Sequence, residues 1–196
     1  MHKGQHISES CVFSSTSASE ILSIVNGLKT SESVGIDEIS TKFLKQTIST
    51  IALPFSNIIN ACISRGTFPD NMKLARVTPI YKSGSREEFS NYRPISILNS
   101  FSKVFEKVIV KRLLSFISKH LLLSNAQFGF RQNHSTNMAM MNLFDKVTEA
   151  IDNNDYCVGV FIDLSKAFDT LNHEILLRKL EFYGTRGLPN LLLKVI

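Results

Sequence analysis

An aspartate at the end of an apolar run is the residue whose setting points most directly to chemistry. Residues 157–164 read CVGVFIDL, so Asp163 lies within a nearly continuous apolar stretch. Such a stretch is typical of a strand buried on both faces, where an ionised carboxylate is costly unless another group offsets its charge. A bound Mg²⁺ would offset it. Hydrogen bonds from nearby backbone amides are the alternative.

Basic side chains are concentrated in one stretch, residues 71–112, which we call the basic segment. It holds nine basic residues against three acidic ones, a net charge of +6, while the rest of the chain sums to −1. A positive stretch of this kind favours a polyanionic partner such as nucleic acid or a triphosphate. From charge alone, a solvated helix face is an equally good interpretation.

Composition excludes several other classes of site. Cys11, Cys62 and Cys157 are far apart in the sequence, so we expect small packing residues rather than disulfides or a zinc site. Residues 152–155 lack the glycine and distal glutamate of a calcium loop. The apolar runs are much shorter than the roughly 20 residues of a membrane span, and the Ser-rich N-terminus is unlike a secretory signal. We therefore expect a cytosolic or nuclear protein without membrane contact.

The elements that position these residues follow from apolar periodicity, which predicts an α+β fold. Ser17 and Glu20 form a possible capping box for the first helix, and Pro54 is expected to separate the second helix from the third. Strands are expected over residues 73–81 and at the apolar run that contains Asp163. Helices are predicted over residues 17–29, 38–49, 53–64, 101–117, 136–151 and 172–183.

Two of these helices carry patterns that need interpretation. In the helix over residues 136–151, the apolar stripe is expected to be core rather than a cofactor site. In the helix over residues 101–117, a lysine row (Lys103, Lys107 and Lys111) is interpreted as structural, with contact to a template phosphate as the alternative. Asp169, beyond the predicted strand, is expected to cap the following helix rather than to bind metal.

Several motifs resemble, in order, those of reverse transcriptases from non-LTR (LINE-type, Jockey-like) retrotransposons. Residues 161–173, FIDLSKAFDTLNH, resemble the family's first palm motif. The other matches are GID (35–37) with FLK (43–45), GTFP (66–69) through PIYKSG (79–84), NYRPIS (91–96), and QFGFR (127–131) with Ser135 and Thr136. Because they keep the family's order across about residues 17–187, the resemblance is specific.

The resemblance implies a truncated form of the reverse transcriptase fold, with the fingers and part of the palm of a right-hand polymerase. Residues 1–16 are expected to be a poorly ordered N-terminus, and residues 17–70 a helical N-terminal extension. Residues 71–155 correspond to the fingers. Residues 156–196 correspond to the incomplete start of the palm, with the downstream palm and the thumb missing.

It also implies roles for five residues. Asp163 matches the catalytic aspartate that binds both Mg²⁺ ions. Lys82 and Arg93 match fingers residues that hold the triphosphate of the incoming nucleotide, although by composition alone either is an ordinary surface charge. Phe168 matches the aromatic residue that packs under the sugar and excludes a ribose 2′-hydroxyl; a core Phe is the alternative. Arg131 is similar to a template or nucleotide contact.

The function implied is RNA-directed DNA polymerisation, with an RNA template, a DNA primer and deoxynucleoside triphosphates as partners. The family completes its metal site with a Tyr/Phe-Ala-Asp-Asp hairpin, and this sequence has no Asp-Asp pair. We therefore expect the isolated chain to be inactive. The alternative is a catalytically dead nucleic-acid-binding remnant of a degraded element. A plain helical DNA-binding module would instead need a recognition helix and would leave Asp163 without a metal.

Overall fold

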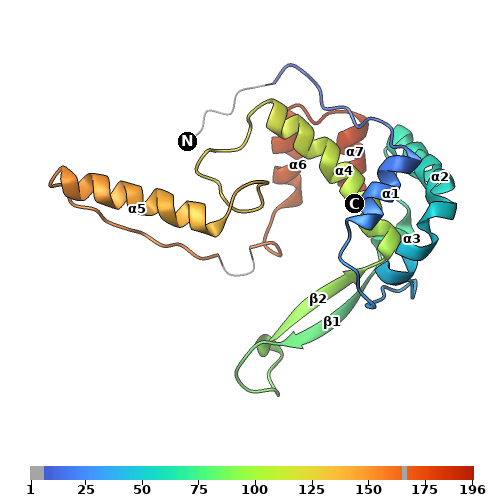
Figure 1. The fold of residues 1–196 in the computed structure, drawn as a ribbon, viewed down its shortest axis with the longest axis horizontal. Coiled ribbons are helices and arrows are strands. Elements are labelled where there is room, and N and C mark those ends of the chain that lie inside the picture. Colours follow the sequence, from blue (N-terminus) through green and yellow to red (C-terminus); the bar gives the residue numbers. More distant parts are fainter. Residues whose placement is uncertain (1–6, 165–166) are drawn as a thin grey trace.

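A computed structural model describes residues 7–164 and 167–196 of the chain. Its described part combines helices with one two-stranded antiparallel sheet, which agrees with the predicted α+β class (Figure 1). The elements in chain order are α1 (Ala18–Asn26), α2 (Thr41–Arg65), α3 (Asp70–Lys73), β1 (Ala75–Tyr81), the 3-10 turn η1 (Phe89–Asn91), β2 (Tyr92–Leu98), α4 (Ser100–Lys119), α5 (Thr136–Asp152), α6 (His173–Phe182) and α7 (Leu188–Val195).

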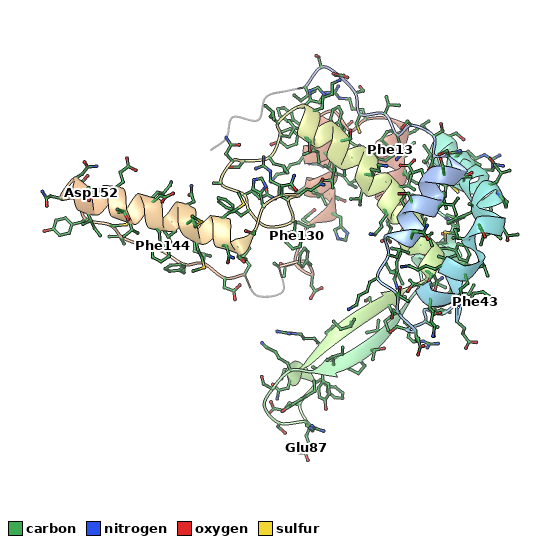
Figure 2. All side chains as sticks on the ribbon, in the orientation of Figure 1. Phe13, Phe43, Glu87, Phe130, Phe144 and Asp152 are labelled. Carbon is green, nitrogen blue, oxygen red and sulfur yellow. The ribbon has the colours of Figure 1, made fainter. Side chains whose placement is uncertain are left out.

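The hydrophobic core lies where α1, α2, α4 and α7 meet (Figure 1). Apolar residues of α2 and α4 recur at helical spacing on one face and are almost fully buried there, as Leu44, Ile59, Phe105 and Val108 illustrate. The ring of Phe68 stacks on that of Phe105, with centroids 4.8 Å apart. This helical body is the platform from which the β1–β2 hairpin and α5 project (Figure 2).

Helix α2 is continuous, so the prediction of two helices separated at Pro54 was wrong. Pro54 lies on the exposed face, and so does Thr50, whose carbonyl loses its partner because proline has no N–H. Water can satisfy that carbonyl at the surface, while the apolar stripe continues unbroken on the buried face. By length and composition α2 also suffices to cross a membrane. A core helix passes the same test, and α2 packs its apolar face on α1 and α4.

Residues 7–16 pack against the helical body, in contrast to the poorly ordered N-terminus that the sequence predicted for residues 1–16. Residues 1–6 of that prediction lie outside the described residues. The side chains of Cys11 and Phe13 are buried, and burial raises the pKa of the Cys11 thiol to about 11. The Cys11 N–H donates to the Gly184 carbonyl at 2.8 Å. Tertiary contacts thus fix a segment whose Ser-rich composition indicates disorder.

Asn99 joins the loop before α2 to the start of α4. Its Oδ1 accepts hydrogen bonds from the N–H groups of Ile36 and Asp37 at 3.1 and 3.4 Å, and its Nδ2 donates to the Asn71 carbonyl at 3.0 Å. A Cβ on Gly35 would lie 2.5 Å from Asn99 Oδ1, so only glycine allows this approach. The GID motif therefore serves as a docking point for Asn99.

We expect Asn99→Ala to lower the free energy of unfolding by about 2 kcal/mol, because it removes three partly buried hydrogen bonds that join the loop before α2 and the Asn71 carbonyl to the start of α4. Chemical denaturation monitored by circular dichroism measures the change. The matched control is Asn142→Ala on the exposed surface of α5, for which we expect a change within about 0.5 kcal/mol. Equal stability of the two variants would contradict the role of Asn99.

The segment around Asp163 departs most from the sequence prediction. Residues 157–164 form no strand, and the prediction of a strand buried on both faces was wrong: Val160 and Phe161 are 79% and 87% exposed. A strand needs hydrogen-bonded neighbours, and the described residues pair only β1 with β2 as named strands. Cys157 is exposed as well, so the packing role predicted for it is not observed.

Helix α5 begins after Ser135, whose side chain accepts a hydrogen bond from the Met138 N–H at 3.3 Å. Its apolar stripe, however, is exposed, so the expectation of a core stripe was wrong; Phe144 is 63% exposed. Figure 2 shows Phe144 and Asp152 on a helix that projects from the body. Helical periodicity predicts which face is apolar, but burial requires another element to cover that face.

Candidate functional site

The β1–β2 hairpin positions Lys82 and Arg93, two of the predicted nucleotide-binding residues. The strands pair Ile80 with Arg93 and Tyr81 with Tyr92, and the Lys82 N–H donates to the Asn91 carbonyl at 2.8 Å. Because side chains alternate between the two faces of a strand, Lys82 and Arg93 lie diagonally on the same face. Both are exposed. The structure thus brings them together as two adjacent cations, and their role stays a prediction.

Strand β2 was not predicted, because Pro94 within its sequence argues against a strand. Pro79 of β1 lies directly opposite Pro94. Hydrogen-bonded and non-hydrogen-bonded residue pairs alternate along an antiparallel ladder. Because Lys82 and Asn91 are hydrogen-bonded, Pro79 and Pro94, three positions further along the ladder, form a non-hydrogen-bonded pair. Neither proline therefore needs an N–H that points toward the other strand. Both prolines are therefore compatible with a two-stranded sheet.

The loop between the strands is held by its own side chains. Asn91 Nδ2 donates to the Ser85 carbonyl at 2.8 Å and to Glu88 Oε2 at 3.2 Å. Gly84 has a φ of +94°, and a Cβ there would lie 2.6 Å from Asn91 Nδ2. Glycine is thus required on both conformational and steric grounds. Figure 2 shows Glu87 at the outer end of this loop.

Asp163 is exposed and forms no ion pair with a side chain of the described residues. Within residues 7–164 and 167–196, no group of three or more His, Cys, Asp or Glu side chains could hold a metal ion. The next two positions of the motif, Ser165 and Lys166, lie outside the described residues. Among the described residues, Asp163 is thus an exposed carboxylate without an ion-pair partner.

Phe168 contacts Phe130, the residue next to Arg131 in the segment between α4 and α5. The ring of Phe168 is 76% exposed and meets that of Phe130 edge to face, with centroids 6.1 Å apart. Arg131 is half-buried and donates from Nη1 to the Ser124 carbonyl at 3.0 Å. Phe168 is thus not the core residue considered as an alternative. The predicted cap role of Asp169 was wrong, because Asn172 caps α6 by accepting from the Ile175 N–H at 3.1 Å.

The predicted site residues do not form one assembled pocket in this structure. The hairpin with Lys82 and Arg93 and the segment with Asp163 leave the body in different directions (Figure 1). In the lysine row of α4, Lys111 binds Glu20 with 2.7 Å between Nζ and Oε1, so at least this lysine has a structural partner.

A partly buried ion pair between α1 and α4 was missed at the sequence level. Arg112 donates from Nη1 and Nη2 to the two carboxylate oxygens of Glu20 at 2.6 and 2.5 Å. The two side chains are only 10% and 16% exposed. Hydrogen bonds from Arg112, opposed by partial burial, lower the pKa of Glu20 to about 2. The signal available in the sequence is the position of Arg112 on an otherwise apolar helix stripe, where a charge needs a partner.

Comparison with known proteins gives the class to which this fold and this set of residues belong. The family described as reverse transcriptase (RNA-dependent DNA polymerase) matches residues 80–195. This range includes the end of β1, the loop and strand β2 of the hairpin, helix α4 and the segment with Asp163. The chain belongs to the reverse transcriptase family.

The individual relatives are reverse transcriptases and related proteins encoded by mobile elements. The chain is 37% identical over 163 residues to a probable RNA-directed DNA polymerase from transposon BS of Drosophila melanogaster, which covers 83% of the chain and 18% of that relative. It is 30% identical over 171 residues to the RNA-directed DNA polymerase from mobile element jockey of the same species, covering 85% and 18%.

A further match is the putative 115 kDa protein in the type-1 retrotransposable element R1DM of Drosophila melanogaster, at 30% identity over 169 residues, 85% of the chain and 16% of the relative. The predicted resemblance to reverse transcriptases of non-LTR elements is confirmed. The chain spans less than a fifth of the length of these relatives.

Proposed function

We propose that this chain supplies part of an RNA-directed DNA polymerase, which copies an RNA template onto a DNA primer from deoxynucleoside triphosphates. The observation that carries the proposal is the family match over residues 80–195, joined to a hairpin that sets two exposed cations side by side on one face. In this assignment residues 71–155 act as fingers and residues 156–196 as the beginning of the palm.

The part proposed for the hairpin is to bind the triphosphate of the incoming nucleotide, as the resemblance implies, and its geometry supports this role. A guanidinium binds phosphate oxygens in pairs, and an ammonium adds a mobile point charge. Arg93 and Lys82, diagonal on one face, would therefore bind the triphosphate of the incoming nucleotide and orient its α-phosphate for in-line attack. Phe168, whose ring is exposed, would pack against the sugar of that nucleotide.

Asp163 fits the ligand chemistry of Mg²⁺, because it presents a hard, charged oxygen donor without a competing cation among the described side chains. Two such ions, when bound, activate the primer 3′-hydroxyl and neutralise the leaving pyrophosphate. Asp163 would contribute one carboxylate to them, and other residues of the complete domain and the substrate phosphates would supply the remaining ligands.

The experiment that tests the proposal is a chimera, in which the residues of this chain that align with the jockey polymerase replace the aligned segment of that enzyme. We expect the purified chimera to extend an oligo(dT) primer on poly(rA) with dTTP and Mg²⁺. A folded chimera without incorporation would support the second candidate, a catalytically dead nucleic-acid-binding remnant, to which the basic segment also lends support.

In the chimera, Arg93→Ala should raise the dTTP concentration needed for half-maximal rate about ten- to a hundredfold, because it removes a charge-assisted phosphate contact worth about 1.5 to 3 kcal/mol. Steady-state incorporation kinetics measure the effect.

The matched control is Arg76→Ala, which removes the same charge from the same face of β1, about 20 Å along the strand from Lys82. We expect its dTTP dependence to be unchanged. A similar effect of both substitutions would mean that the hairpin acts only through its net charge and would contradict a specific triphosphate contact.

A further inference from the structure

The hairpin has a second face, opposite the one that carries Lys82 and Arg93. Tyr81 and Tyr92 lie across from each other on it, with ring centroids 5.7 Å apart and planes at 63°. The alternation of the ladder makes them a non-hydrogen-bonded pair, in which opposing side chains approach most closely. One end of the hairpin therefore has a basic face and an aromatic face.

Both tyrosine rings are fixed from the loop side. Tyr81 Oη donates to the Gly84 carbonyl at 2.5 Å, and Tyr92 Oη donates to the Arg86 carbonyl at 2.9 Å. The hydroxyls thus have partners in the loop, while the residue Tyr81 remains 38% exposed. Apolar ring surface is held at the surface of a projecting hairpin, far from the hydrophobic core (Figure 1).

Arg86 completes this face. Its guanidinium carbon lies 5.1 Å from the centre of the Tyr81 ring, over the ring, so the cation is held by the aromatic surface. Among the side chains that the structure describes, no carboxylate forms an ion pair with Arg86. We call Tyr81, Arg86 and Tyr92 the tyrosine face. It combines positioned rings with a guanidinium that forms no ion pair with the described side chains, although Glu87 and Glu88 follow it in the loop.

We propose that the tyrosine face binds a single-stranded stretch of nucleic acid, with nucleobases stacked on the tyrosine rings and the Arg86 guanidinium, and with Arg86 contacting the adjacent phosphate. Aromatic rings beside cations are the combination that recognises unpaired strands, because every base has a π-face and every nucleotide a phosphate. A duplex does not fit, since its bases are already stacked. The inference rests on the proposed function: the incoming nucleotide occupies one face of the hairpin, and unpaired template occupies the other.

The test uses the full chain and a fluorescein-labelled ten-nucleotide oligoadenylate, rA10, as the probe, alone or annealed to its complement. We expect Tyr81→Leu and Tyr92→Leu each to weaken rA10 binding about tenfold, with little change in duplex binding. Tyr156→Leu is the matched control, because Tyr156 is a fully exposed tyrosine outside the hairpin, and we expect wild-type affinity for it. Arg76→Ala serves as the charge control on the opposite face.

A second measurement, tyrosine fluorescence, keeps Tyr81 and Tyr92 and therefore does not require the loop to remain folded after a Leu substitution. In a Tyr156→Phe, Tyr183→Phe background, Tyr81 and Tyr92 are the remaining tyrosines, and we expect rA10 to quench their fluorescence while the duplex does not. Unquenched fluorescence at saturating rA10, or an equal loss of single-strand and duplex binding in the Leu variants, would overturn the proposal. Neither measurement involves catalysis, so a failure here leaves the polymerase proposal standing, and an inactive chimera leaves the tyrosine face standing.

Discussion

Nucleotide incorporation by the chimera is expected to fall about 10³-fold when Asp163 is replaced by Asn. The substitution keeps the shape of the side chain but removes the negative charge that would hold the catalytic ions. Ligation of those ions contributes several kcal/mol of charge stabilisation in the transition state, and about 4 kcal/mol corresponds to the expected factor. Single-turnover incorporation of dTTP on poly(rA) with an oligo(dT) primer measures the chemical step.

The control for this experiment is Asp155→Asn, which removes the same charge from an exposed turn eight positions earlier in the sequence. We expect that variant to keep the rate of the chimera. Melting curves establish that the Asp163→Asn protein remains folded, which is expected because Asp163 is exposed and makes no ion pair with a described side chain. Full activity of Asp163→Asn would show that the residue has no part in the chemistry.

Glu20→Gln in the isolated chain is expected to lower the free energy of unfolding by about 2 to 3 kcal/mol at pH 7. The substitution leaves Arg112 as a cation that is 10% exposed and has lost its bidentate carboxylate, and unpaired buried charges are strongly destabilising. For a chain of this size the midpoint of thermal unfolding should fall by roughly 5 to 10 °C. Thermal and chemical unfolding followed by circular dichroism measure both quantities.

The pH dependence of this difference provides its internal check. Hydrogen bonds from Arg112, Lys111 and Thr16, with Arg112 contributing most, lower the pKa of Glu20 from its ordinary value of 4.5 to about 2 in the folded chain. The contribution of Glu20 is therefore complete above about pH 4.5 and is lost as the pH falls toward 2. The gap between wild type and Glu20→Gln should close over that range. A gap that is the same at pH 7 and pH 3 would mean that packing, rather than charge, is responsible.

Glu32→Gln is the matched control for the ion pair. Glu32 binds Lys42 at 2.7 Å, but the side chains are 80% and 55% exposed, so solvent screens the interaction. We expect its removal to change the stability by less than about 0.5 kcal/mol. Comparable losses in the two variants would indicate a general response to reduced negative charge.

The helix starts depend on local contacts, although for α6 the sequence favoured Asp169 as the cap and the structure has Asn172. Ser17, Ser135 and Asn172 each accept a hydrogen bond from a backbone N–H in the first turn of the helix that follows. A side-chain oxygen at this position satisfies a donor that the helix itself leaves free. The partner is three residues away in the chain in each case, so cap formation depends on local sequence.

In the candidate site, too, some features were predictable from the sequence and others only from the structure. The order of the motifs was enough to assign the family and to select Asp163, Lys82, Arg93, Arg131 and Phe168. The diagonal placement of Lys82 and Arg93 on one face was not predictable, because it depends on β2, and Pro94 conceals that strand. The ion pair between Glu20 and Arg112 joins residues 92 positions apart, beyond the reach of any periodicity.

By itself, then, the sequence determined the family, the mixed fold class, the capped start of α1 and the apolar face of each amphipathic helix, because these follow from residue type and from neighbours within a few positions. Tertiary structure alone decided which faces are covered. The stripe of α2 is buried straight past Pro54, whereas the equally apolar stripe of α5 and the run before Asp163 remain exposed. Burial depends on which other part of the chain packs against a surface, and the pattern of apolar residues along one segment does not predict that partner.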